Sequence, residues 1–157
     1  MKNDISYIDA LKKAQQYCAN EEKCVADVRR KLYDWSADKN DVDKIIESLE
    51  TENFIDENRY SQFFARDKFK FNKWGKIKIA YELRMKKIPN QIIQQAFESI
   101  DATDYFEMIE NEIAKKFNEI ERREKDIYQL KSKILKFGQS RGYEDELVRK
   151  AIANIKL

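Results

Sequence analysis

The chain has 157 residues, of which 42% are hydrophobic and 38% charged, and its formal net charge is +2. The hydrophobic share is enough for a packed core, whereas three Gly and one Pro are too few for a sandwich or barrel of many short strands. The sequence has no histidine, which excludes a Cys-His zinc site, a Ser-His-Asp triad and a Cys-His nucleophile. We therefore expect an all-α protein.

The two cysteines, Cys18 and Cys24, lie six residues apart and form no CxxC motif. We expect both to be small buried hydrophobic residues in a reducing compartment. The sequence contains no run of 18 apolar residues and no basic, apolar signal at its N-terminus. It therefore predicts a soluble, cytoplasmic protein without a membrane partner.

The first third of the chain places apolar residues at helical spacing in three successive segments. Asn20 is predicted to cap the second of these helices, and Asp41 lies near the cap of the third. The apolar positions are Tyr7, Leu11, Ala14 and Cys18, then Val25, Val28, Leu32 and Trp35, then Val42, Ile45, Ile46 and Leu49.

The middle third opens at Asp56, because its carboxylate can accept hydrogen bonds from the first free amides of a helix. Gly75 interrupts the pattern, and Pro89 marks another helix start because a helix tolerates proline only in its first turn. The apolar positions are Tyr60, Phe63, Phe64 and Phe71, then Ile79, Ala80 and Leu83, then Ile92, Ile93, Ala96, Phe97 and Ile100.

The last third begins near Thr103 with a long apolar face, and Gly142 is predicted to end its second helix from the C′ position. The apolar positions are Phe106, Ile109, Ile113, Phe117 and Ile120, then Ile127, Leu130, Ile134 and Phe137, then Leu147, Val148, Ala151, Ile152 and Ile155.

The last helix repeats an earlier apolar pattern. Its five positions match 92, 93, 96, 97 and 100 with a constant offset of 55, and positions 45, 46 and 49 precede that pattern by 47. A period near 50 predicts three tandem three-helix repeats, over residues 7–54, 55–101 and 102–157 of a single domain, 1–157. Such an array is elongated because each repeat buries its apolar face mainly on its neighbours.

Positive charge is concentrated between residues 66 and 87. Nine Lys or Arg stand there against Asp67 and Glu82, an excess of seven in a chain whose net charge is only +2. A basic surface attracts phosphate groups and releases their counterions on binding, although a solvated face without such a partner is also common. We expect contacts with phosphates or with an acidic protein surface from Arg66, Lys68, Lys70, Lys73, Lys76, Lys78, Arg84, Lys86 and Lys87.

Aromatic residues are interleaved with these basic ones, at Phe69, Phe71, Trp74 and Tyr81. They can stack on single-stranded bases, or they can belong to the core of helices that also carry solvated lysines. Core packing is the favoured interpretation for most of them. Trp74, beside Gly75 at a helix junction, is the one we expect to be exposed.

No motif in the sequence indicates enzymatic chemistry. Gly75-Lys76 is not part of a P-loop, because no glycine lies five residues earlier and Ile77 replaces the required Ser or Thr. The carboxylates lie beside lysines at helical spacing, where solvated pairs are the ordinary explanation. We expect no catalytic residue, no metal and no cofactor.

Three motifs, in order along the chain, resemble those of the RecX family, the bacterial regulators of the RecA recombinase. Residues 54–60 (FIDENRY) resemble its aromatic-aliphatic-Asp-x-x-Arg-aromatic segment, and Arg66 follows where that family has an Arg. Residues 75–83 (GKIKIAYEL) resemble its Gly-x-x-x-Ile-x-x-Glu-Leu motif, and residues 141–143 (RGY) its Arg-Gly-aromatic segment. Lys87 departs from the pattern where a Gly is usual, and Gly138 where a Leu is common.

The resemblance implies a curved, elongated monomer built as a right-handed array of three three-helix repeats. It also implies binding of the RecA–single-stranded DNA filament in its helical groove, with inhibition of RecA ATP hydrolysis, strand exchange and co-protease activity. Recombination, DNA repair and the SOS response are the processes that such inhibition affects. Single-stranded DNA is the expected second partner, and double-stranded DNA is a further candidate.

The motif residues have physical roles of their own. Asp56 is expected to cap its helix or to pair with Arg59, and Glu82 to pair with Lys78 or Lys86 or to orient a neighbouring loop. Gly75 is expected to allow a conformation or a close approach that a side chain forbids. Ile79 and Leu83 are core positions.

Two other functions fit the sequence less closely. One is a general nucleic-acid-binding helical module without recombinase specificity. The other is a tetratricopeptide-like protein scaffold, whose Trp-Leu-Gly signature at a period of 34 is missing.

Overall fold

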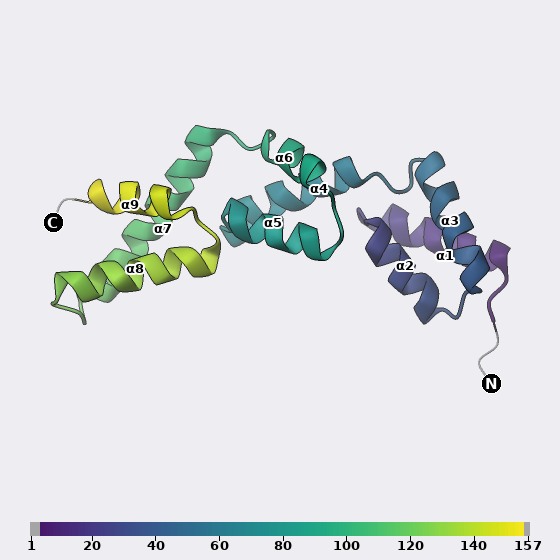
Figure 1. Cartoon of the computed structure of the whole chain (residues 1–157), viewed down its shortest axis with the longest axis horizontal. Coiled ribbons are helices and arrows are strands. Elements are labelled where there is room, and N and C mark those ends of the chain that lie inside the picture. Colours follow the sequence, from purple (N-terminus) through teal and green to yellow (C-terminus); the bar gives the residue numbers. More distant parts are fainter. Residues whose placement is uncertain (1–3, 156–157) are drawn as a thin grey trace.

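The computed structural model, which describes residues 4–155, is an elongated arch of helices (Figure 1). The first unit consists of α1 (Tyr7–Asn20), α2 (Val25–Asp34) and α3 (Lys39–Thr51), and the middle unit of α4 (Glu57–Asp67), α5 (Lys76–Met85) and α6 (Asn90–Phe97). The third unit consists of α7 (Ala102–Glu121), α8 (Ile127–Arg141) and α9 (Asp145–Ala153). Residues 4–155 form no strand beyond an isolated bridge between Ile5 and Ala37, so the all-α prediction is confirmed.

The helices pack against one another mainly inside these three groups, which follow each other along the arch. A π-helical turn, η1 (Lys68–Asn72), continues α4 to the start of the Trp74-Gly75 junction. No helix of the described chain is both long and apolar enough to cross a bilayer. The expected boundaries at residues 54/55 and 101/102 and the right-handed sense of the array stay predictions.

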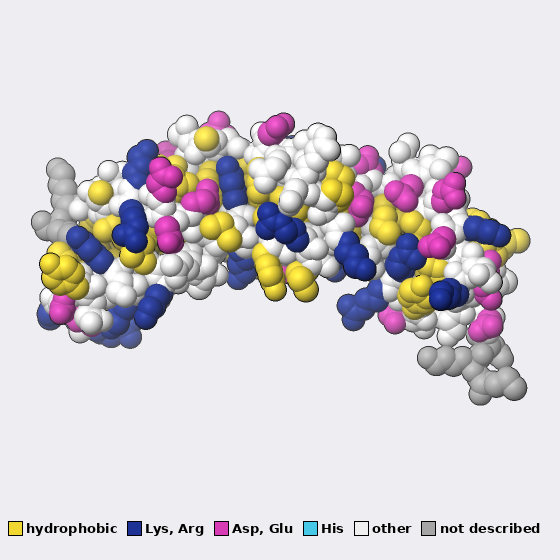
Figure 2. Space-filling model, in the orientation of Figure 1, with side chains coloured by type: hydrophobic (Ala, Val, Ile, Leu, Met, Phe, Trp, Pro, Cys, Tyr) yellow, Lys and Arg dark blue, Asp and Glu magenta, His cyan; other side chains and the backbone are white. Residues whose placement is uncertain are grey.

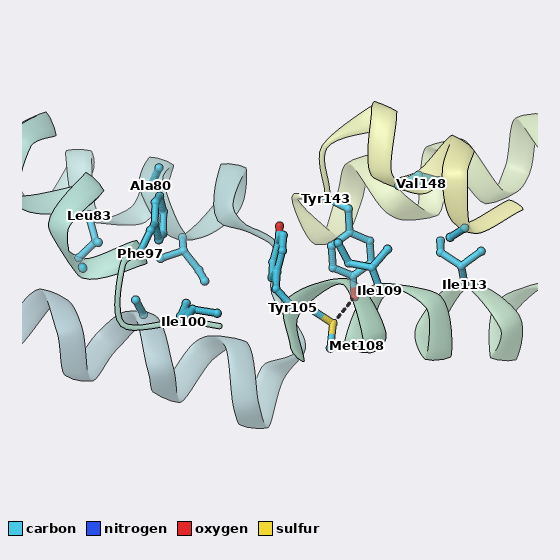
Figure 3. Close-up of a cluster of buried hydrophobic side chains, with 14 of the residues drawn as sticks. Ala80, Leu83, Phe97, Ile100, Tyr105, Met108, Ile109, Ile113, Tyr143 and Val148 are labelled. Atoms are coloured by element: carbon cyan, nitrogen blue, oxygen red, sulfur yellow. Dashed lines mark hydrogen bonds between the residues drawn. The ribbon is translucent and has the colours of Figure 1, made fainter. Parts of the chain in front are cut away.

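The apolar side chains form two clusters. The first unit has its own core, in which Val28, Leu32, Ile45 and Leu49 are fully buried. The middle and third units share a second, continuous core, which Cys24 of the first unit also joins. Figure 3 shows this core passing from Leu83 and Phe97 of the middle unit to Ile109 and Val148 of the third. The middle and third units are therefore joined by apolar packing.

Each unit turns from its second to its third helix through one residue with positive φ. These residues are Ser36 at 61°, Lys87 at 62° and Gly142 at 84°. In each turn, the amide of the following residue donates a hydrogen bond to the carbonyl five positions earlier. These bonds run from Ala37 to Leu32 at 3.0 Å, from Ile88 to Leu83 at 3.1 Å, and from Tyr143 to Gly138 at 2.9 Å. The turns are separated by 51 and 55 residues, so 51 replaces the offset of 47 obtained from the looser sequence match.

Both departures from the motif pattern, Lys87 and Gly138, lie at these turns. Lys87 keeps the left-handed turn that glycine adopts without cost, so the turn geometry is retained. Gly138 occupies the position of Leu32 and Leu83, and an added Cβ would lie 2.7 Å from a methyl of Val148. Val148 thus fills the space that the missing side chain leaves.

Helix caps follow the sequence with one exception, at Asn20. Asp56 caps α4 by accepting from the Arg59 amide at 3.1 Å, and Pro89 directly precedes α6, both as expected. Asn20 is instead the last residue of α1, because the cap position directly before the apolar stripe of α2 belongs to Cys24. The cap of α3 is Asp38, which accepts from the Asn40 amide at 2.7 Å, and Asp41 lies near it in the first turn, as expected.

Candidate interaction surface

The N-terminal end of α5 is fixed by the third unit. The first amides of a helix lack partners inside it and must be satisfied from outside. Here each of three successive amides donates to an oxygen of the third unit: Gly75 to the Arg141 carbonyl at 2.7 Å, Lys76 to the Tyr105 hydroxyl at 2.9 Å, and Ile77 to the Gly142 carbonyl at 3.0 Å. The orientation of α5 is therefore set by residues far away in the sequence.

Two glycines make this junction sterically feasible. A Cβ added to Gly75 would lie 2.2 Å from the Gly142 carbonyl oxygen, and a Cβ added to Gly142 would lie 2.3 Å from the Cβ of Lys78. The expectation that Gly75 allows a close approach is confirmed. The second and third motifs of the resemblance are thus two sides of one contact.

Tyr143 completes the junction from within the core. Its hydroxyl donates to the Lys73 carbonyl at 2.7 Å and lies 3.4 Å from the Met108 sulfur (Figure 3). Burial raises the pKa of Tyr143 to about 12, so the hydroxyl remains a proton donor at neutral pH. Lys73, whose φ is 58°, is held at the sharp turn between η1 and Trp74.

The C-terminal end of α5 is fixed to the first unit by charge. The Lys86 ammonium lies 2.5 Å from a carboxylate oxygen of Asp27 on α2. Burial of Asp27 opposes its ionisation, but hydrogen bonds from Lys86 and Cys24 hold its pKa below the ordinary value. A second pair joins Arg59 to Glu22 at 2.6 Å. Lys86, expected to contact a partner, is therefore occupied within the chain.

Trp74 is partly buried, so the expectation that it is the exposed aromatic is wrong. Its ring packs edge-on to Phe64, and the ammoniums of Lys78 and Lys68 lie 4.5 Å and 5.1 Å from its centroid. The exposed aromatics of this stretch are Phe71, at 70% exposure, and Tyr81, at 59%. The indole thus organises two of the predicted basic residues instead of meeting a partner itself.

The other basic candidates lie on several sides of the middle unit. Arg66, Lys70, Arg84 and Lys87 are exposed, and Arg84 also bonds the Asn90 side chain at 2.9 Å. The Lys76 ammonium lies 4.7 Å from the ring centroid of Tyr105. Lys70 and Lys73 border a cleft of about 270 Å³ whose other side is the acidic face of α7, with Asp104, Glu107 and Glu112. Several of the nine basic residues therefore already have acidic or aromatic neighbours within the chain.

The roles expected of Asp56 and Glu82 have different outcomes. Asp56 both caps α4 and lies 4.0 Å from the Arg59 guanidinium, so its two expected roles coexist. Glu82 makes neither expected pair within the described residues, because Lys86 binds Asp27 and Lys78 lies over Trp74. Ile79 and Leu83 are fully buried, as expected.

The outward face of α5 is apolar at its centre. Ile77, Tyr81 and Met85 follow one another at intervals of four and are 55%, 59% and 64% exposed. We call these three residues the α5 stripe. Figure 2 shows hydrophobic and basic side chains side by side along the lower edge of the molecule, where α5 lies. The stripe was not predicted from the sequence, although the 76–85 segment carries apolar residues on both faces of its helix.

A cleft of about 690 Å³ separates the C-terminal end of α5 from α2. Arg29 and Arg30 line one side and Lys86 and Lys87 the other, over an apolar floor that includes Val25, and the carboxylates of Asp34 and Glu57 also belong to the lining. Arg29 binds Asp43 at 2.9 Å and Lys86 binds Asp27, which leaves Arg30 and Lys87 as its facing cations. Arg29 and Arg30 were not predicted as contact residues from the sequence, although the basic run Arg-Arg-Lys at 29–31 indicated positive charge there.

The fold and these surfaces define a class: an elongated all-helical protein whose middle unit presents basic and apolar side chains outward. A family model described as "RecX, second three-helix domain" matches residues 56–96. Regulatory protein RecX of Clostridium acetobutylicum is 30% identical over 140 residues, which cover 88% of this chain and 64% of that protein. RecX of Clostridium beijerinckii is 31% identical over 133 residues, covering 85% and 62%. The chain thus spans just under two thirds of these relatives' length.

Solved structures show the same fold. A crystal structure of regulatory protein RecX superposes with a TM-score of 0.86 at 17% identity, over 94% of this chain and 73% of that one. RecX from Lactobacillus salivarius superposes with a TM-score of 0.83 at 17% identity, over 94% of each chain. The chain is therefore similar to RecX proteins over most of its length and has the fold of the solved ones.

Proposed function

We propose that this chain is a non-enzymatic regulator of the RecA recombinase. It binds the RecA–single-stranded DNA filament in the helical groove and inhibits ATP hydrolysis, strand exchange and co-protease activity, thereby modulating recombination, DNA repair and the SOS response. Similarity to RecX proteins supports the proposal, since the similar proteins from the two clostridia are named regulatory proteins. In this proposal the protein acts in the cytoplasm as a monomer, without a cofactor.

The observation that carries the proposal is the mounting of α5. Its first turn is bonded to the third unit, and the residue after its last turn is paired with the first unit. A helix held at both ends needs no ordering of its backbone on binding, which lowers the entropic cost of association. An elongated arch with such a helix at its centre suits a partner that is itself long.

The facing cations of the α2–α5 cleft are the proposed contacts with DNA phosphates. Arg30 and Lys87 lie on opposite sides of an apolar floor, so a strand that crosses the cleft is neutralised from both sides. Each phosphate contact adds to the dependence of affinity on salt. For the double variant Arg30→Glu/Lys87→Glu, we expect the negative slope of log affinity for oligo-dT against log salt to become shallower by about 1.4.

The decisive experiment is a titration of the single-stranded-DNA-dependent ATPase of RecA. We expect hydrolysis to fall as this chain covers the filament, and less so with Arg30→Glu/Lys87→Glu. The matched control is Lys12→Glu/Lys44→Glu, which reverses two exposed lysines of α1 and α3. Unchanged hydrolysis at stoichiometries that cover the filament contradicts the proposal.

The α2–α5 cleft also favours a second candidate, a general nucleic-acid-binding module. Salt-sensitive DNA binding that depends on Arg30 and Lys87, without any change in RecA hydrolysis, is the result that distinguishes it.

A further inference from the structure

Helix α5 is apolar on two opposite faces. Ile79 and Leu83 point into the core and are fully buried, whereas the α5 stripe of Ile77, Tyr81 and Met85 points outward. A helix that serves only to hold the fold carries polar residues on its outer face. The stripe leaves more than half of each side chain exposed, so burial within the described fold does not account for its apolar character.

The stripe is not covered by any other part of residues 4–155, and α5 is not free to turn it inward. Hydrogen bonds to the third unit and the Lys86–Asp27 pair fix the helix at both ends. Three large apolar side chains that stay more than half exposed on one rigid helix are typical of a binding site.

The chemistry of the stripe fits a protein better than a nucleic acid. Tyr, Met and Arg are enriched in the cores of protein interfaces, and Arg84 lies next to Met85 on the same exposed side of α5. Lys78 borders the stripe on its other side, and Glu82 is the only acid of the helix. A phosphate backbone can make neither a hydrogen bond nor an ion pair with Ile77 or Met85, and packing against them would strip water from the phosphates.

We propose that the α5 stripe docks a protein surface whose apolar ridge is bordered by carboxylates that meet Arg84 and Lys78. This rests on the proposed function, and within it the stripe contacts the recombinase protein while the α2–α5 cleft contacts the DNA. The basic stretch thus divides into a protein-binding helix and a phosphate-binding cleft.

The test compares binding to the filament with binding to naked DNA. Replacing hydrophobic contacts at the centre of an interface lowers affinity by about thirtyfold or more. We expect Tyr81→Ser/Met85→Ser to lose filament affinity by that factor, measured by fluorescence anisotropy on recombinase-coated oligo-dT, and to bind bare oligo-dT as the parent does. Circular dichroism checks that the helices are intact.

The matched control is Ile8→Ser/Tyr128→Ser, which removes two exposed hydrophobic residues, 62% and 83% exposed, outside the middle unit. It should bind both targets like the parent. Unchanged filament affinity of the stripe variant overturns the proposal, as does an equal loss on bare DNA. A parent dimer that the stripe variant dissociates, seen by analytical ultracentrifugation, also overturns it, because the occupant is then a second copy.

A probe peptide separates failure of the docking surface from failure of the proposed function. The peptide is an amphipathic helix with Leu at every fourth position and Glu on both flanks, and its control is a scrambled sequence of the same composition. The parent protein should bind the amphipathic peptide but not the scrambled one. The Tyr81→Ser/Met85→Ser variant should bind neither peptide. Peptide binding without filament binding overturns the proposed function alone, whereas no peptide binding by the parent overturns the docking surface.

Discussion

Gly75 and Gly142 meet backbone to backbone, with the Gly142 carbonyl oxygen 2.2 Å from where a Gly75 Cβ would lie. The Gly75 amide meanwhile donates to the neighbouring Arg141 carbonyl at 2.7 Å. The middle and third units therefore dock through main-chain atoms, which cannot repack as side chains do. This contact ties two distant sequence motifs to a single geometric requirement.

Gly75→Ala is expected to lower the free energy of unfolding by about 3 kcal/mol, because the added methyl overlaps backbone and displaces three capping hydrogen bonds. Urea denaturation followed by circular dichroism measures the loss. Gly138→Ala is the control, since its methyl meets only the side chain of Val148, which can shift. Equal stabilities of Gly75→Ala and the parent contradict the backbone contact.

Lys87→Gly is expected to raise the free energy of unfolding by about 0.5–1 kcal/mol. The left-handed conformation costs an ordinary residue about 1–2 kcal/mol, and the extra freedom of glycine in the unfolded chain offsets part of the gain. The midpoint of urea unfolding reports the change. Lys87→Ala removes the same charge but keeps the strained φ, so it should show no such gain. A gain in both variants would instead implicate charge.

Removing the Asp27–Lys86 pair should destabilise the protein by about 1 kcal/mol at pH 7, since Asp27 is largely buried and Lys86 partly exposed. The folded pKa of Asp27 is lowered from 3.8, so its contribution is present above pH 3.8 and is lost as pH falls through the folded pKa. The gap in unfolding free energy between parent and Asp27→Asn should therefore close below about pH 4. A gap that is constant between pH 7 and pH 3 would show that the carboxylate charge is irrelevant.

Cys18 and Cys24 should react slowly with a thiol reagent at pH 8. Burial raises the pKa of both thiols to about 11, so very little thiolate is present, and Cys24 is inaccessible to solvent. Absorbance during reaction with a disulfide reagent measures the rate, and urea above the unfolding midpoint should accelerate both thiols. Rapid reaction of the folded protein would indicate that the first unit opens frequently.

Most of the fold was predictable because it depends on local patterns. The apolar positions Ile45, Leu83 and Ile134 are all fully buried, as their helical spacing indicates, and Asp56 and Gly142 mark helix ends through chemistry that a few neighbouring residues define. Asn20 shows the limit, because several polar residues compete for a cap and only the start of the helix decides between them.

The candidate surface was predictable only in part. Charge density located the basic stretch, but partners such as Asp27 for Lys86 or Trp74 for Lys78 lie on other segments or depend on the π-helical turn, which no sequence pattern indicated. The α5 stripe was not predicted from the sequence, for a related reason. The sequence of a helix with two apolar faces shows which residues are apolar, but it does not show which face the neighbouring units cover.

The two joints of the arch differ in kind. Apolar packing and main-chain hydrogen bonds connect the middle unit to the third, whereas the Arg59–Glu22 and Lys86–Asp27 pairs contribute much of the link to the first. Ion pairs weaken with added salt and with acid, whereas apolar packing does not. We expect ionic strength to loosen the first unit while the other two move together, so the distance between the arch's ends changes by a swing at one hinge. A partner that repeats along a helix would then select one span from the range that this hinge permits.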